Sequence, residues 1–240
     1  MNTGETSKTR HQQTLEVLDQ IAESGKSLGI ILQTTSDDQM DGRIVHVGDK
    51  KFINFTNCSY LGLEMDARLI GGVIDATTRY GTQFASSLSY LSMTMYEEVE
   101  ELLGKIFKAP VALSQTTSLG HISNIPILVG DRDAVIMDIS VHATVQEAVS
   151  LLVERGITIE RVRHNRMDQL EERIRELRMT HEKIWYMADG VYSMFGDGAP
   201  LKELKTLLDA YEQFYLYIDD AHGMSWAGEN GAGFVYTQLP

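Results

Sequence analysis

Two adjacent carboxylates and an imidazole directly follow the apolar stretch Phe214–Ile218, namely Asp219, Asp220 and His222. An ionised carboxylate at the end of a buried strand is costly unless it has a partner. The residues alone leave three uses open. They could bind a metal ion through oxygen and nitrogen, or pair one carboxylate with a protonated heterocycle nitrogen. They could also form a structural ion pair or a helix cap.

Polar residues also follow three other apolar stretches. The hydroxyl-rich turn Ser114–Gly120 leads into a predicted helix, where free N–H groups can hold a phosphate or the hydroxyls can simply cap the helix. His142 begins another predicted helix, a position suited to stacking on a ring, to proton transfer or to capping. The segment Asp189–Gly198 is rich in glycine, which is typical of a loop.

These groups can act together only if the strands before them end at one edge of a sheet. Periodicity predicts helices over 11–28, 66–80, 94–107, 119–129, 144–155, 167–179 and 201–211. It predicts strands over 42–47, 51–56, 111–114, 134–138, 157–161, 184–188 and 214–218. The alternation indicates an α/β fold with a mostly parallel sheet flanked by helices. The continuously apolar runs Ala134–Met137 and Phe214–Ile218 are typical of strands covered on both faces. In such sheets ligands bind beyond the carboxyl ends of the strands.

Composition excludes several classes of protein. The 240 residues carry a formal net charge of −13, which argues against binding to a nucleic-acid backbone. A single cysteine, Cys58, excludes a disulfide framework and a cysteine-based zinc site. The polar segment Met1–Thr14 lacks the apolar core of a signal peptide, and no apolar run approaches the ~20 residues of a membrane helix. We therefore expect a cytoplasmic protein with no membrane span.

Six short motifs occur together along the chain, namely Tyr60–Leu63, Gly130–Val135, Val141–Thr144, Asp189–Met194, Asp219–Gly223 and Gly228–Gly233. Their order resembles that in the α-oxoamine synthases, which are pyridoxal-phosphate enzymes of fold type I. This family includes aminooxononanoate synthase, 2-amino-3-ketobutyrate CoA ligase, serine palmitoyltransferase and 5-aminolevulinate synthase. The resemblance runs from about Phe52 to about Gly233.

The resemblance implies that the cofactor is pyridoxal 5′-phosphate (PLP) and assigns roles to the residues around it. His142 matches the histidine that stacks on the pyridine ring, and Asp219 matches the aspartate that pairs with the ring nitrogen. Such a carboxylate keeps the nitrogen protonated, so the ring can accept electrons. His222 and Ser193 match residues near the O3′ hydroxyl. The candidate catalytic residues are thus His142, Asp219 and His222.

The phosphate and substrate contacts follow from the same resemblance. Thr116, Thr117 and Ser118 fall on the loop whose backbone amides hold the phosphate, and Asn57 is a candidate substrate contact. Several positions on the acyl-CoA and substrate side depart from the family pattern: Cys58 for an asparagine, Leu88 for an arginine, Leu91–Met93 for Ser-Gly-Thr, and Ser118 for an aromatic residue.

The resemblance also implies a domain organisation. Residues 1–50 are expected to form an N-terminal helix and a short extended arm. Residues 51–240 correspond to the PLP-binding large domain of an aspartate-aminotransferase-like fold, incomplete at its C-terminus. By resemblance the chain forms a homodimer, in which the N-terminal helix packs on the partner and residues near 81–94 reach the neighbouring cofactor.

In this family a lysine beyond the Asp-Asp-Ala-His segment binds the cofactor covalently. The last lysines here, Lys202 and Lys205, precede Asp219 on a predicted helix, where we expect them to face solvent. The resemblance therefore predicts that the lysine strand and the C-terminal small domain are missing and that this chain alone is weakly active or inactive.

The reaction implied for the family is the decarboxylative condensation of an amino acid with an acyl-CoA or acyl-carrier thioester. Two alternatives stay open. One is another fold type I reaction, either aminotransfer or side-chain cleavage. The other is a non-catalytic fragment that binds PLP or dimerises.

Overall fold

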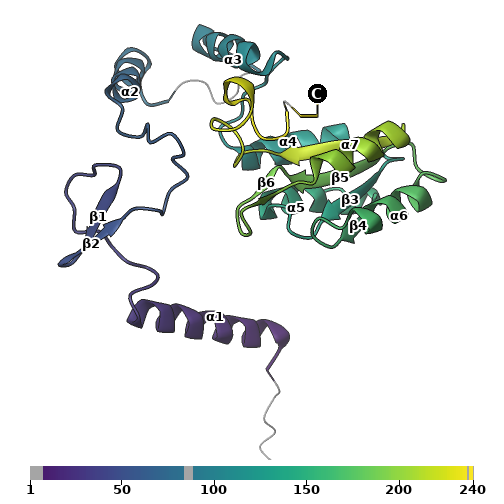
Figure 1. Ribbon diagram of the computed structural model, residues 1–240. Coiled ribbons are helices and arrows are strands. Elements are labelled where there is room, and N and C mark those ends of the chain that lie inside the picture. The colour runs from purple at the N-terminus through teal and green to yellow at the C-terminus, as the bar shows by residue number, and fades with distance from the viewer. Residues whose placement is uncertain (1–7, 84–88, 237, 240) are drawn as a thin grey trace, which may run out of the picture. The chain divides into compact units, whose positions relative to one another are not determined.

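The computed structural model describes residues 8–83, 89–236 and 238–239, and it divides into two compact units, Met1–Arg79 and Tyr80–Pro240 (Figure 1). Each unit is described by itself. The expected domain boundary at residues 50 and 51 concerns cofactor binding and stays a prediction. Among the described residues, no helix has the length and apolar character needed to cross a bilayer.

The first unit contains two helices and a hairpin, as the sequence predicted. Helix α1, Arg10–Ser27, begins at a capping box in which Thr9 and Gln12 each accept a hydrogen bond from the other's backbone N–H. Strands β1, Ile44–Val47, and β2, Lys50–Ile53, pair in antiparallel fashion. Gly48 makes the turn between them at φ +57°, where a residue with a Cβ would be strained. Helix α2, Ala67–Tyr80, follows the hairpin.

The second unit is built on a parallel sheet of four strands in the order β4-β3-β5-β8. Their bounds are β3, Ala134–Asp138; β4, Thr158–Val162; β5, Ile184–Asp189; and β8, Phe214–Asp219. Every neighbouring pair is parallel, so all four carboxyl ends lie along one edge. The predicted α/β architecture is confirmed. Because the strands are parallel, the polar residues at their carboxyl ends gather at one edge of the sheet.

Helices cover both faces of this sheet (Figure 1). The helices of the unit are α3, Thr94–Phe107; α4, Thr117–Leu128; α5, Ala143–Ser150; α6, Met167–Leu177; and α7, Leu201–Ala210, with 3-10 turns at Val153–Arg155 and Glu229–Gly231. Ile136 and Tyr186 point into one apolar cluster with residues of α6 and α7. Val135 and Met187 point into the other, with residues of α4 and α5. The alternation along β3 and β5 thus explains why both strands are fully buried.

The structure corrects several expected elements. Residues 111–114 are not a strand: the N–H of Leu113 donates to the Glu100 carboxylate instead of to a neighbouring strand. The helix expected over 144–155 ends at Ser150 and continues only as a separate 3-10 turn. The loop after β5 contains a hairpin that was not predicted. It consists of two antiparallel strands of two residues each, β6, Val191–Tyr192, and β7, Asp197–Gly198.

Strand β8 also differs from expectation. It was predicted to be covered on both faces, but only Phe214 of β8 is buried as a whole residue, although the side chain of Asp219 is largely buried. The reason is that β8 lies at the edge of the sheet, where it pairs with β5 alone. An apolar run therefore predicted the strand correctly and its coverage wrongly.

Candidate functional site

Three neighbouring strands of the second unit end in aspartates: β3 in Asp138, β5 in Asp189 and β8 in Asp219. In the parallel register Asp189 lies opposite Asp219. Asp138 is fully buried and Asp189 is 4% exposed. Sequence reasoning selected only Asp219 as a site residue, although the same pattern of an aspartate after an apolar strand was present at all three positions.

Asp219 is a buried carboxylate with a histidine partner. Its Oδ2 lies 3.0 Å from Nε2 of His121, and its Oδ1 accepts the N–H of Ala221 at 3.1 Å. Only 9% of its side chain is exposed. Burial by itself raises the pKa of Asp219, but the hydrogen bonds from His121 and Ala221 and the nearby imidazoles outweigh burial and hold the pKa below its usual value. A buried negative charge is therefore available to pair with a cation.

His121, on α4, was missed at the level of sequence. It is 6% exposed, and its Nδ1 lies 2.8 Å from the Tyr217 hydroxyl. Burial, and next the charge of Asp219, raise the pKa of Tyr217 to about 12, so the phenol keeps its proton. The available signal was a histidine within the predicted helix Leu119–Val129, most of whose residues are apolar.

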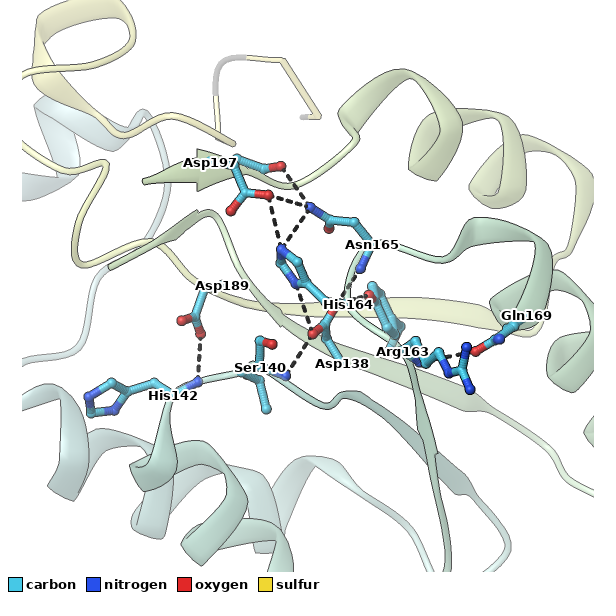
Figure 2. Close-up of polar contacts among 12 residues, drawn as sticks. Asp138, Ser140, His142, Arg163, His164, Asn165, Gln169, Asp189 and Asp197 are labelled. Carbon is cyan, nitrogen blue, oxygen red and sulfur yellow. Dashed lines mark hydrogen bonds and ion pairs between the residues drawn. The ribbon is translucent and has the colours of Figure 1, made fainter. Parts of the chain in front are cut away.

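A cavity of about 540 Å³ lies at the ends of β3 and β5, lined in part by His142, Asp189 and Ser193. The N–H of His142 donates to Oδ1 of Asp189 at 3.0 Å (Figure 2). The exposed His142 ring caps α5, with Nδ1 2.7 Å from the Thr144 hydroxyl. Burial raises the pKa of Asp189 to about 6, and the charge of Asp219 adds to this effect. The structure thus brings two predicted residues, His142 and Ser193, to one cavity.

A second histidine cluster lies beside this cavity (Figure 2). His164 Nδ1 is 3.2 Å from Asp138 Oδ1, and its Nε2 is 2.9 Å from Asp197 Oδ2. Burial lowers the pKa of His164, but its hydrogen bonds to the two carboxylates outweigh burial and leave the pKa above its usual value. The ring also stacks on Phe195, with centroids 4.9 Å apart. Because Phe195 lines the cavity, His164 holds one wall in place.

Asp220 has partners different from those of Asp219. Its Oδ2 accepts the N–H of Val235 at 2.9 Å, and burial raises its pKa. A Cβ added to Gly190, Gly223 or Gly233 would come within 2.3 Å of its carboxylate, so these glycines form a tight enclosure. Asp220 is therefore a packing residue, and the two adjacent carboxylates do not act as one pair. Within the described residues, no group of three or more His, Cys, Asp or Glu is placed to hold a metal ion.

The remaining predicted residues lie at several places. Thr116 caps α4 by accepting the N–H of Leu119 at 3.2 Å, with Thr117 and Ser118 in the first turn. Because α4 also carries His121, this helix N-terminus is connected to the end of β8. His222 lies in the turn after β8, where its carbonyl accepts the indole N–H of Trp226.

Residues of the substrate and lysine predictions lie elsewhere. Asn57 belongs to the first unit, where it lines a separate cavity of about 510 Å³. Leu88 falls outside the described residues. Lys202 and Lys205 are exposed on α7, as expected, and Lys205 pairs with Asp209 on the same helix.

Comparison with known proteins gives consistent matches. The family model described as aminotransferase class I and II matches residues 50–237. The chain is 33% identical over 196 residues to 8-amino-7-oxononanoate synthase of Coprothermobacter proteolyticus, covering 81% of this chain and 49% of that protein. It is 30% identical over 225 residues to the Fervidobacterium nodosum protein of the same name, covering 92% and 56%. The chain thus spans about half the length of the curated relatives it matches.

Solved structures show the same fold. A variant of serine palmitoyltransferase from S. paucimobilis, solved with a bound PLP–myriocin aldimine, is 25% identical with a TM-score of 0.77, covering 94% of this chain and 59% of that one. The 8-amino-7-oxononanoate synthase of Francisella tularensis is 22% identical with a TM-score of 0.60, covering 77% and 49%. The second likeness concerns the fold alone. Together these matches confirm the resemblance to the α-oxoamine synthases.

Proposed function

Because this chain belongs to the aminotransferase class I and II family, within its α-oxoamine synthase group, we propose that it forms the PLP-binding part of an acyl-transferring enzyme. The observation that carries the proposal is the buried, ionised carboxylate of Asp219 at the carboxyl edge of a parallel sheet. That is where open α/β sheets bind ligands, and the group there is one that can pair with a protonated pyridine nitrogen.

The side chains at this edge fit a phosphorylated pyridine. The twelve-residue helix α4 presents its N-terminus with Thr116, Thr117 and Ser118, which suits a phosphate group. His142 offers an exposed imidazole at the cavity, and Ser193 offers a hydroxyl there. Asp219 supplies the negative charge. We propose that His222 contributes near the ring hydroxyl, as the family resemblance implies.

When bound, PLP supplies a ring that withdraws electrons from a carbanion of the amino-acid substrate. The chain's own residues act around that ring. Asp219 holds the proton on the ring nitrogen, the N-terminus of α4 binds the phosphate, and His142 stacks against the ring. We propose an amino acid and an acyl-CoA or acyl-carrier thioester as substrates, with Asn57 as a substrate contact.

A non-catalytic PLP-binding role is the second candidate, and the lysines favour it. Among the described residues that line the cavity at β3 and β5, none is a lysine. Lys202 and Lys205 lie on the exposed side of α7. We therefore infer that the 240-residue chain binds PLP without a covalent bond and is weakly active or inactive by itself.

Thermal unfolding with and without PLP tests the binding proposal. A ligand that binds only the folded state stabilises it by about 2.7 kcal/mol at a concentration one hundred times its Kd. PLP should raise the Tm of the wild-type chain, whereas Asp219→Asn should lose most of that rise. The exposed Asp209→Asn is the matched control. Failure of PLP to raise the Tm of the wild-type chain would contradict the proposed function.

Two further measurements separate the candidates. Borohydride reduction followed by intact-mass analysis should leave the 240-residue chain without a stoichiometric pyridoxyl adduct. CoA release from an acyl-CoA in the presence of single amino acids should be near background. Rapid turnover with any amino acid would overturn the non-catalytic alternative.

We also propose that the chain forms a homodimer in the cytoplasm. Helix α1 has no buried residue, and its Leu18 and Ile21 are more than half exposed, which leaves an apolar face for a partner. The single Cys58 fits a reducing compartment. Light scattering should give twice the chain mass of 26.9 kDa, and Leu18→Glu should shift it toward the monomer.

A further inference from the structure

Helix α4 and strand β8 are joined by a buried side-chain contact that the family motifs do not include. His121 on α4 reaches Asp219 with Nε2 and Tyr217 with Nδ1. We propose that His121 is a positioning residue, which fixes the orientation and the negative charge of the Asp219 carboxylate toward the nitrogen of a bound pyridine ring. This inference rests on the proposed PLP site and deepens it.

The first step is the orientation of the carboxylate. The Nε2–H of His121 occupies one lone-pair site of Oδ2 at 3.0 Å, and the Ala221 N–H occupies one of Oδ1 at 3.1 Å. Two fixed donors on different oxygens define the plane of the carboxylate. An ionised carboxylate has about four acceptor sites, so sites remain for a third donor. A pyridinium N–H is such a donor.

The second step is the choice of tautomer. An ionised carboxylate only accepts, so Nε2 of His121 carries the proton that faces Asp219. The Tyr217 hydroxyl lies 2.8 Å from Nδ1 and can donate to that nitrogen when it carries no proton. Tyr217 and Asp219 are two residues apart and point to the same face of β8. One strand face therefore holds both ends of the imidazole.

The third step concerns the charges around Asp219. Asp189 on the neighbouring strand and Asp220 next in sequence are both acidic; burial raises the pKa of each, and the charge of Asp219 adds to this effect. His142 acts in the opposite direction on Asp219. Without the His121 hydrogen bond and charge, burial would favour protonation of Asp219. A neutral acid would no longer hold a proton on the ring nitrogen.

Two substitutions of His121 test this role. His121→Leu keeps an apolar side chain of similar size and removes both contacts. His121→Gln keeps an amide N–H donor at a comparable reach and serves as the rescue variant. Circular dichroism establishes that each variant folds, and Tyr217→Phe, which removes only the second contact, keeps the test possible if the leucine variant does not.

The first readout needs no cofactor. Carboxyl carbon NMR titration, assigned with Asp219→Asn, should show the pKa of Asp219 rising by about one pH unit or more in His121→Leu. His121→Gln should stay near the wild type, and Tyr217→Phe should show a smaller rise. An unchanged pKa in a folded His121→Leu chain would overturn the proposal.

The second readout compares PLP with its analogue in which carbon replaces the ring nitrogen. His121→Leu should bind PLP about tenfold to a hundredfold more weakly than the wild type, the range for one lost hydrogen bond to a charged group. Affinity for the analogue should change little. Equal weakening of both ligands would mean a merely structural role and would overturn the proposal.

PLP binding by the wild-type chain and control of Asp219 by His121 are measured independently. If the wild-type chain binds no PLP, the proposed function fails, and the cofactor role of His121 fails with it. The Asp219 titration still reports whether His121 controls the carboxylate, because it is measured on the free protein. If PLP binds normally but the titration is unaffected by His121→Leu, only the positioning role is overturned.

Discussion

Each of the two histidine clusters at the carboxyl edge of the sheet contacts a strand-end aspartate, but the second partner of the imidazole differs. His164 lies between two carboxylates, those of Asp138 and Asp197. His121 lies between one carboxylate, that of Asp219, and the neutral hydroxyl of Tyr217. Both histidines come from segments far in sequence from the aspartates they contact, and both bind through both ring nitrogens.

The difference lies in the charge that each imidazole must carry. Two ionised carboxylates offer only acceptors, so they favour a His164 ring with protons on both nitrogens, in line with its raised pKa. A carboxylate and a phenol are satisfied by a neutral ring. The His164 cluster is therefore an ion-paired wall of the cavity, whose strength depends on pH. The His121 cluster is a set of hydrogen bonds that orients the Asp219 carboxylate toward a ligand.

The largest effect is expected at the buried end of the ion-paired cluster. Asp138→Ala removes the acceptor for the N–H of Asn165 at 2.8 Å and for the Tyr186 hydroxyl at 3.2 Å, together with the partner of His164. Loss of one partner of a buried charged pair costs about 3–5 kcal/mol. Urea unfolding measures this loss, with the exposed Asp168→Ala as the control. A loss of stability equal to that of the control would contradict the role of Asp138 as a buried partner of His164.

Substitution of His164 should separate the clusters by pH. Its folded-state pKa lies above the unfolded value, so its contribution is complete below about pH 6.5 and is lost as the pH rises through the folded pKa. His164→Gln should cost about 2 kcal/mol at pH 5.5 and clearly less at pH 9. Thermal unfolding across this range is the measurement, with the part-buried His181→Gln as the control. A cost that does not depend on pH would show that His164 is neutral.

Asp189 sharpens the comparison because it is a strand-end aspartate with no histidine ring bonded to its carboxylate among the described contacts. Its pKa of about 6 exceeds the unfolded value of about 3.9, so the folded state loses stability as the pH rises from 4 to 6. Asp189→Asn should stabilise the chain by about 2 kcal/mol at pH 8 and hardly at pH 4. The amide oxygen can still accept the N–H of His142. Destabilisation at pH 8 would contradict this account, with Asp209→Asn as the control.

The smallest effect is expected at Tyr217. Tyr217→Phe removes one hydroxyl and leaves Nδ1 of His121 without its donor, at a cost of about 1 kcal/mol. Because the pKa of Tyr217 is about 12, its charge does not change between pH 6 and pH 9, and the cost should be the same at both values. Tyr215→Phe on the exposed side of β8 is the matched control. A strong pH dependence would erase the distinction between the two clusters.

Much of the fold was predictable because periodicity reflects local physics. The bounds of β3 and α3 coincide with prediction, and those of α6 and α7 differ by at most two residues. The errors occurred where pairing decides the outcome. Residues 111–114 are apolar enough for a strand, yet none of the described strands pairs with them. Likewise residues Phe214–Ile218 of β8 form an apolar run, but the strand lies at an edge of the sheet.

Some features of the candidate site were also predictable from local sequence patterns, and others depend on tertiary contacts. The sequence indicated that Asp219, His142 and Ser193 follow strands that end at one edge, and the structure places His142 and Ser193 at one cavity. The cofactor and substrate roles stay predictions for all the site residues, namely Asp219, His142, Ser193, Thr116, Thr117, Ser118, His222 and Asn57. The sequence did not reveal that Asp220 packs among glycines, because that enclosure joins Gly190, Gly223 and Gly233 only in three dimensions.

By itself the sequence determined the α/β architecture, the order of the motifs and the family resemblance, since all of these are written in local patterns and their spacing. Only the tertiary structure decided which groups each aspartate meets. His121 lies 98 residues before Asp219 in the chain, and His164 lies 26 residues after Asp138. Strand register and helix packing bring each pair within hydrogen-bonding distance. The physical reason is that burial raises the energy of an unpaired charge, so the partner, wherever it lies in the sequence, decides the charge that the site can hold.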